Sequence, residues 1–193
     1  MFPLNLPNAL TLIRILLVPV LVVALTVETP GGSTIAAIVF AIAALTDGLD
    51  GYIARSRQAV TTFGKVMDPV ADKLMIAAAL ISLVSLERVA AWVAMVVIAR
   101  EFAVSGLRIA AGQQGVVIPA SGLGKVKTIV QVLAVLALIA ANDPDAVWVQ
   151  TLVYLMVAIT VASGADYFLN FRRKIEEAAE ERRAASAARQ RST

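Results

Sequence analysis

Apolar residues occur in long blocks along this chain, not in a helical stripe or in strand-like alternation. The stretches 16–27, 35–45 and 147–161 are nearly apolar on every side, which is typical of helices that face lipid. Six such segments, each near the roughly 20 residues needed to cross a bilayer, can be drawn at 7–27, 34–53, 69–86, 89–110, 124–141 and 146–168. Turn signals after Thr29 and from Asn142 imply antiparallel neighbours. The pattern predicts an all-α polytopic membrane protein, a bundle of six transmembrane helices.

Composition narrows the chemistry that this bundle can perform. The chain is 59% hydrophobic and only 16% charged, which is too apolar for a water-soluble domain of this size. It contains neither cysteine nor histidine, so disulfides, thiolate metal sites and a histidine base are excluded. Carboxylates and hydroxyls remain, and these hard oxygen ligands favour Mg²⁺, Mn²⁺ or Ca²⁺ over zinc. We expect no nucleic-acid partner.

The distribution of basic residues predicts the orientation in the membrane. Three connections, near 28–33, 86–89 and 142–145, contain a single basic residue, Arg88. The other connections and the segment after the last span hold most of the rest, so by the positive-inside rule we place both termini in the cytoplasm. We expect 1–8 to lie in the membrane interface without being a cleaved signal, 1–170 to form the membrane domain, and 171–193 to form a charged cytoplasmic tail that continues the last helix.

Four aspartates at the predicted cytoplasmic ends of the second and third spans form the most informative pattern. Asp47 and Asp50 are three residues apart, and Asp68 and Asp72 are four apart. If both stretches are helical, each pair occupies one helix face. Carboxylates gathered in a partly dehydrated place repel one another, and divalent cations can compensate that charge and polarise a phosphoryl group. A structural or transport cation site, or a proton relay, is the alternative, but relays usually lie nearer the midplane.

Smaller residues accompany these aspartates. Gly48 and Gly51 let either a partner helix or a nucleotide approach the backbone, and because Arg55 shares their arc we favour the ligand. At the start of the first span, Asn8 and Thr11 either satisfy free backbone N–H groups or contact the same ligand, and both roles stay open.

The spacing from Asp47 to Asp72 resembles the signature of the CDP-alcohol phosphatidyltransferase family, D-x2-D-G-x2-A-R-x8-G-x3-D-x3-D, with every fixed position filled. The resemblance implies a homodimeric enzyme of the bacterial cell membrane that takes a phosphatidyl group from CDP-diacylglycerol. It implies that Asp47, Asp50, Asp68 and Asp72 hold two divalent cations, Mg²⁺ or Mn²⁺, and that Asp72 also accepts the proton of the attacking hydroxyl. It further implies that Gly51, Arg55 and Thr61 contact the CDP moiety, and we assign Gly48, Gly64, Asn8 and Thr11 to the same CDP-lipid site.

A second, basic group indicates which alcohol is the acceptor. Arg100 and Arg108 are eight residues apart in the fourth segment, so they can line one side of a cavity together with Lys125. Basic residues beside a metal site suit an acceptor that carries its own phosphate. Alternatively, Arg108, Lys125 and Lys127 only anchor the membrane boundary, and Arg100 pairs with Glu101 or with an aspartate of the cluster.

Three looser patterns, P-N-A-L-T-L-I-R-I, A-R-E-F and G-K-V-K-T, resemble the bacterial branch of the family that uses glycerol 3-phosphate. The products would then be phosphatidylglycerophosphate and CMP. Inositol phosphate, serine or phosphatidylglycerol remain alternative acceptors. Two other classes of protein stay open. A cation-coupled transporter would show metal-dependent flux and would not need Asp72 as a base, and a structural membrane subunit would tolerate alanine at all four aspartates.

Overall fold

The computed structural model describes residues 6–27, 32–57, 62–118 and 122–191, and for 6–8, 10, 32, 47–57, 62–69, 72, 181, 182 and 184–191 it describes the backbone alone. This described part of the chain contains six α-helices and no strand: α1 (Leu6–Thr26), α2 (Gly32–Arg57), α3 (Thr62–Ser85), α4 (Ala91–Gln113), α5 (Gly122–Ala140) and α6 (Val147–Arg191). The predicted all-helical architecture is confirmed.

Each helix coincides with one of the six apolar segments, and the differences lie at the polar ends. Both α2 and α3 extend through the aspartate motif, so α3 begins at Thr62 and not near Pro69. Hydropathy cannot detect these turns because their charged residues lower it while leaving the backbone helical. α6 continues through the polar tail to Arg191, as expected. The predicted interfacial segment 1–8 lies mostly outside the described residues, because α1 begins at Leu6.

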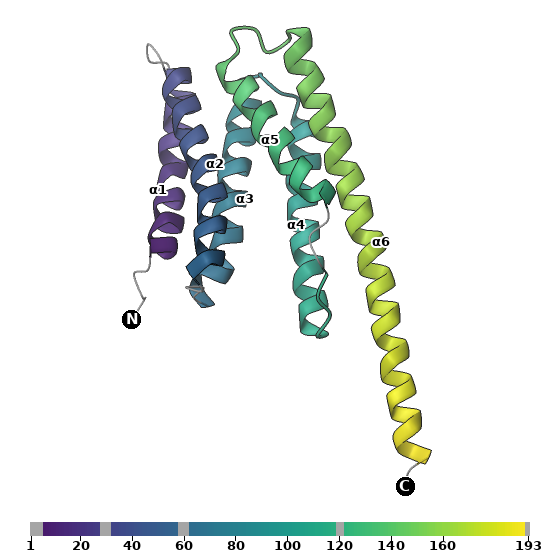
Figure 1. Cartoon of the computed structure of the whole chain (residues 1–193). Helices are drawn as coiled ribbons and strands as arrows, with labels where there is room; N and C mark the ends of the chain where they lie inside the picture. Colours follow the sequence, from purple (N-terminus) through teal and green to yellow (C-terminus); the bar gives the residue numbers. More distant parts are fainter. Residues whose placement is uncertain (1–5, 28–31, 58–61, 119–121, 192–193) are drawn as a thin grey trace.

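The helices form two groups that run up and down in alternation (Figure 1). α1 packs against α2 and α3, and α6 packs against α4 and α5, while α2 meets α5 and α3 meets α4. The start of α1 and the end of α6 lie at the same end of the bundle, and α2 ends and α3 begins there too (Figure 1). This end of the bundle, which carries the aspartate motif, is called the motif end below.

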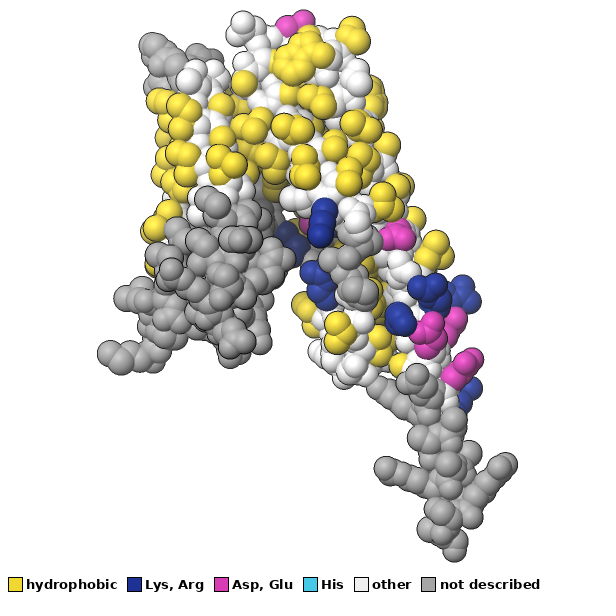
Figure 2. Space-filling view, in the orientation of Figure 1, with side chains coloured by type: hydrophobic (Ala, Val, Ile, Leu, Met, Phe, Trp, Pro, Cys, Tyr) yellow, Lys and Arg dark blue, Asp and Glu magenta, His cyan; other side chains and the backbone are white. Residues whose placement is uncertain are grey.

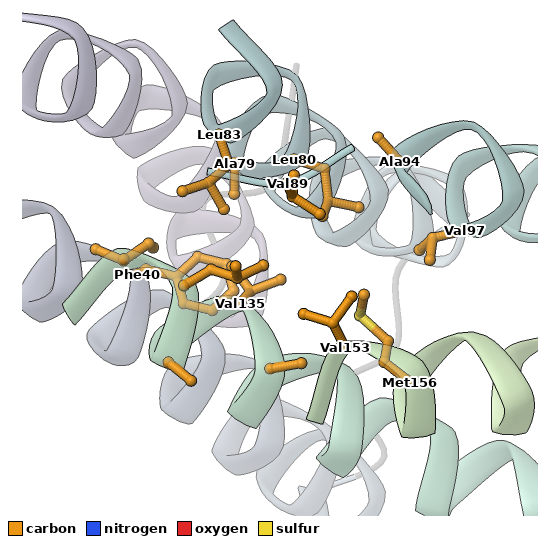
Figure 3. Packing of buried hydrophobic residues seen from close by; sticks show 14 of the residues in the cluster. Phe40, Ala79, Leu80, Leu83, Val89, Ala94, Val97, Val135, Val153 and Met156 are labelled. Carbon is orange, nitrogen blue, oxygen red and sulfur yellow. The ribbon is translucent and has the colours of Figure 1, made fainter. Parts of the chain in front are cut away.

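Small and aliphatic side chains fill the centre of the bundle. Phe40 and Val135 meet near Leu80 and Leu83, and Val97 lies across from Met156 (Figure 3). Alanines such as Ala79 and Ala134 are fully buried between helices, which lets the backbones approach closely. Such packing replaces the hydrophobic effect as the main attraction between helices in lipid.

The outer surface is apolar over most of the bundle, and charged side chains gather toward the motif end and along the tail (Figure 2). Exposed apolar residues occur on every helix, including Leu16, Ile42, Ile81, Met95, Ile129 and Leu155. By length and composition alone, two described helices could cross a bilayer, within Gly122–Ala140 and Val147–Glu180. Shorter apolar stretches occur at Thr11–Thr26, Ser33–Thr46 and Lys73–Ser85. The exposed apolar surface indicates that the protein associates with membranes.

Candidate functional site

The aspartate motif lies on two helices that are adjacent in the bundle. Asp47 and Asp50 lie in about the last three turns of α2, and Asp68 and Asp72 in about the first three turns of α3. Both stretches are therefore helical, which is the condition under which Asp47 and Asp50, and likewise Asp68 and Asp72, were predicted to share a helix face. Gly48, Gly51 and Arg55 belong to the same end of α2, and Gly64 belongs to the start of α3. At these positions and at Asn8, the structure describes the backbone alone. Thr61 lies outside the described residues altogether.

Two polar side chains of α1 face the interior next to this motif. Thr11 and Arg14 are both buried, and Arg14 is only 3% exposed. Arg14 lines a cavity of about 80 Å³, whose other walls include Ala43 and Ala44 of α2 and Met75 and Ile76 of α3. These positions lie one helical turn from Asp47 and Asp72, so the cavity continues the motif toward the interior. The site prediction omitted Arg14, although a lone arginine within an apolar segment was a visible signal.

Arg100 of α4 is held at α6 by polar contacts. Its Nη2 donates to Ser163 Oγ at 3.1 Å, and its Nη1 donates to Glu101 Oε1 at 3.3 Å. Gly164 leaves room for the arginine, because a Cβ added there would lie 3.2 Å from Arg100 Cγ. Of the alternatives for Arg100, pairing with Glu101 is the one observed.

Lys127 of α5 donates to the same oxygen, Glu101 Oε1. Its side chain is 7% exposed, against 15% for Glu101 and 14% for Arg100. A lysine that only anchored the membrane boundary would place its ammonium in water, so that reading of Lys127 is wrong. One carboxylate oxygen thus joins cations of α4 and α5. Glu101 was quoted in the A-R-E-F pattern but was not predicted as a site residue.

Arg108 and Lys125, the other two predicted acceptor ligands, are both exposed. The guanidinium of Arg108 lies 5.8 Å from the ring centroid of Tyr167, a cation–π contact with α6. Arg100 and Arg108 therefore both contact α6, while the cavity that they were predicted to line together with Lys125 stays a prediction. Lys125 is two positions before Lys127, so it lies on a different side of α5 and stays accessible.

One electrostatic interaction links the basic residues of α4 and α5 to a helix that carries the aspartate motif. The charges of Arg100 and of Lys73 both act on the Lys127 ammonium, and Lys73 adjoins Asp72 in α3. Figure 2 shows Lys and Arg side chains gathered beside a hollow of the surface at the motif end. Among the side chains that are described, no group of three acidic residues could hold a metal ion. The Lys127 ammonium thus lies within electrostatic reach of α3, one of the two helices that carry the aspartates.

Comparison with known proteins agrees with this geometry. A model of the CDP-alcohol phosphatidyltransferase family matches residues 4–162, which include the whole aspartate motif and the basic residues of α4 and α5. The chain belongs to this family. The match confirms the resemblance that the motif spacing carried.

Named relatives cover most of the chain. The CDP-diacylglycerol–glycerol-3-phosphate 3-phosphatidyltransferase of Bacillus subtilis is 41% identical over 180 residues, covering 85% of this chain and 93% of that protein. A probable phosphatidylglycerophosphate synthase of Mycobacterium tuberculosis is 39% identical, covering 84% of this chain and 79% of that protein. A CMP-forming cardiolipin synthase of rice is 40% identical over 72% of this chain, but the match spans only 47% of that protein.

Proposed function

We propose that this protein transfers the phosphatidyl group of CDP-diacylglycerol to glycerol 3-phosphate, giving phosphatidylglycerophosphate and CMP. The observation that carries the proposal is the complete aspartate motif on the adjacent ends of α2 and α3, in a chain whose 41% identical relative is named for this reaction. The buried cations at the same end support an acceptor that carries a phosphate.

The proposal includes an arrangement in the membrane. All six helices cross the bilayer, with both termini and the motif end in the cytoplasm of a bacterial cell, residues 1–170 forming the membrane domain and 171–193 the tail. Exposed apolar residues on every helix and the basic residues near the motif end support this topology. The functional unit is a homodimer, as the family resemblance implies.

The donor set at the motif fits two divalent cations, Mg²⁺ or Mn²⁺. Asp47, Asp50, Asp68 and Asp72 offer only hard oxygen ligands, in a chain without cysteine or histidine. Such ions, when bound, supply positive charge to the diphosphate and to the departing CMP. Without cations, four carboxylates at the adjoining ends of two helices would repel one another.

The chain's own residues perform the remaining chemistry. Arg55, with Gly48, Gly51, Thr61, Gly64, Asn8 and Thr11, binds the CDP end of the lipid, whose acyl chains remain in the bilayer. Asp72 accepts the proton of the acceptor hydroxyl, whose oxygen forms a bond to the phosphorus that carries diacylglycerol while the bond from that phosphorus to CMP breaks. Arg100, Arg108 and Lys125 bind the acceptor phosphate. No covalent intermediate with the enzyme is needed.

The experiment incubates purified protein with CDP-diacylglycerol and Mg²⁺ or Mn²⁺, and measures CMP release with each of four acceptors. These are glycerol 3-phosphate, inositol phosphate, serine and phosphatidylglycerol. We expect release with glycerol 3-phosphate alone. Release only with phosphatidylglycerol would replace the acceptor. Absence of release with every acceptor would reject the enzyme.

A further inference from the structure

We infer that Glu101 is a positioning residue for the acceptor phosphate, which it serves by holding Arg100 and Lys127 in fixed places before that phosphate arrives. The inference rests on the proposed function. It adds to the proposed site a residue that is negatively charged and therefore cannot bind a phosphate directly. Its basis is one shared oxygen: Glu101 Oε1 accepts hydrogen bonds from Arg100 Nη1 and from Lys127 Nζ.

The contact brings together two helices that otherwise have little to join them. Lys127 lies 26 positions after Glu101, on α5, while Glu101 and Arg100 lie on α4. α4 packs mainly against α6 and α3, and α5 against α6 and α2. The position of the Lys127 ammonium relative to α4 is therefore set by this carboxylate.

A carboxylate is needed here because the surrounding charges repel. Arg100 and Lys127 bring two positive charges to one carboxylate, and the charge of Lys73 also acts on Lys127. At 7% exposure, water screens the lysine weakly. Glu101 offsets one of the two charges that it binds, so Arg100 and Lys127 together keep a net positive charge that would attract a phosphate monoester, whose charge is about −1.5 to −2.

Donors remain after Glu101 is satisfied. An ammonium has three N–H donors and a guanidinium has five. Lys127 uses one of its donors for Glu101. Arg100 uses two, one from Nη1 for Glu101 and one from Nη2 for Ser163. Arg100 Nε is buried and has no hydrogen-bond partner among the described residues. Because this N–H is buried beside Gly164, the donors left for a phosphate are the remaining N–H groups of the terminal nitrogens. Both cations are thus immobilised and still able to donate to a phosphate.

The test compares Michaelis constants for the two substrates. In Glu101→Gln, the KM for glycerol 3-phosphate should rise about tenfold or more, while the KM for CDP-diacylglycerol stays near that of the wild type. The melting temperature should fall, because Lys127 and Arg100 lose the carboxylate that offsets their charges. Glu87→Gln, which removes a carboxylate at the other end of the bundle, is the matched control and should change neither constant. An unchanged or lower KM for glycerol 3-phosphate in Glu101→Gln would overturn the inference.

A charge swap separates positioning from simple bridging of α4 and α5. The double variant Glu101→Lys with Lys127→Glu keeps an ion pair but reverses its direction. It should melt like the wild type and keep the raised KM, since the ammonium now lies on α4. Recovery of the wild-type KM would make Glu101 a structural bridge and reject the inference.

If Glu101→Gln fails to fold, Gly164→Ala tests the same cluster without removing a charge. The added Cβ, 3.2 Å from Arg100 Cγ, requires the arginine side chain to shift by a few tenths of an ångström. A rise of severalfold in the KM for glycerol 3-phosphate alone is expected, and an equal rise for both substrates would contradict the inference. Failure of the proposed function would appear separately, as wild-type protein that releases no CMP with glycerol 3-phosphate.

Discussion

The two ends of the bundle use charged residues in opposite ways. At the motif end, four aspartates lie on the adjoining ends of α2 and α3, and cations of α4 and α5 share the carboxylate of Glu101. At the other end, Arg88 follows α3, and its side chain serves the backbone of α5. Its Nε donates to the Leu138 carbonyl at 2.7 Å, and its Nη2 donates to the carbonyl of Ala141.

Arg88 thus satisfies carbonyls at the end of α5 that lack partners within the helix, and its charge favours the negative end of the helix dipole. The cations of the motif end are bound to side chains instead, and they keep donors for a ligand. In this molecule, the partners of a charged side chain therefore distinguish an arginine that completes a helix end from cations that keep donors for a ligand. The predictions below separate the ends by measuring activity and stability in the same variants.

The largest expected effect is on activity at the motif end. In Asp72→Asn, CMP release should fall by about 10²- to 10⁴-fold, the usual contribution of a general base. The melting temperature should not fall, since removing one of several repelling carboxylates relieves the fold. Asp145→Asn, an exposed aspartate at the other end, is the control and should be fully active. Full activity in Asp72→Asn would reject Asp72 as the base while leaving the reaction class untouched.

The helices themselves could be predicted because apolar blocks of the right length are a local signal. The predicted ends failed at α2 and α3, where charged residues interrupt the hydropathy but not the backbone hydrogen bonding. The aspartate motif could also be recognised, because its fixed positions lie close together in the sequence, within two consecutive helices. The roles given to its side chains remain predictions.

The basic residues show what sequence could not supply. The spacing of Arg100 and Arg108 predicted that they could line one side of a cavity together with Lys125. Both arginines contact α6, and the cavity itself stays a prediction. The burial of Lys127, by contrast, depends on Glu101, 26 positions earlier on another helix. No periodicity links two such positions, so only packing reveals that Lys127 is the buried lysine of its helix and Lys125 the exposed one.

A smaller effect, this time on stability, is expected at the other end. Arg88→Ala removes two hydrogen bonds from a charged donor to backbone carbonyls and should lower the free energy of unfolding by about 2 to 3 kcal/mol. Thermal unfolding in detergent measures the loss, and CMP release per folded molecule should stay at the wild-type value. Arg88→Lys, which keeps the charge but cannot reach two carbonyls as a fork does, should recover only part of the stability. Loss of activity at unchanged stability would contradict the division between the two ends.

The smallest effect concerns the turn next to Arg88 and has the opposite sign. Glu87 has a φ of +58°, the left-handed region, where it ends α3 with the Glu87 N–H bonded to the Val84 carbonyl and the Arg88 N–H to the Leu83 carbonyl. Glycine adopts this φ without steric cost, so Glu87→Gly should raise the free energy of unfolding by up to about 1 kcal/mol. The greater conformational entropy of glycine in the unfolded chain reduces this gain. Glu87→Gln keeps the strain and should melt like the wild type. If Glu87→Gly lowered the free energy of unfolding, the carboxylate of Glu87 would have to stabilise this end of the bundle. Backbone geometry alone would then not explain the turn.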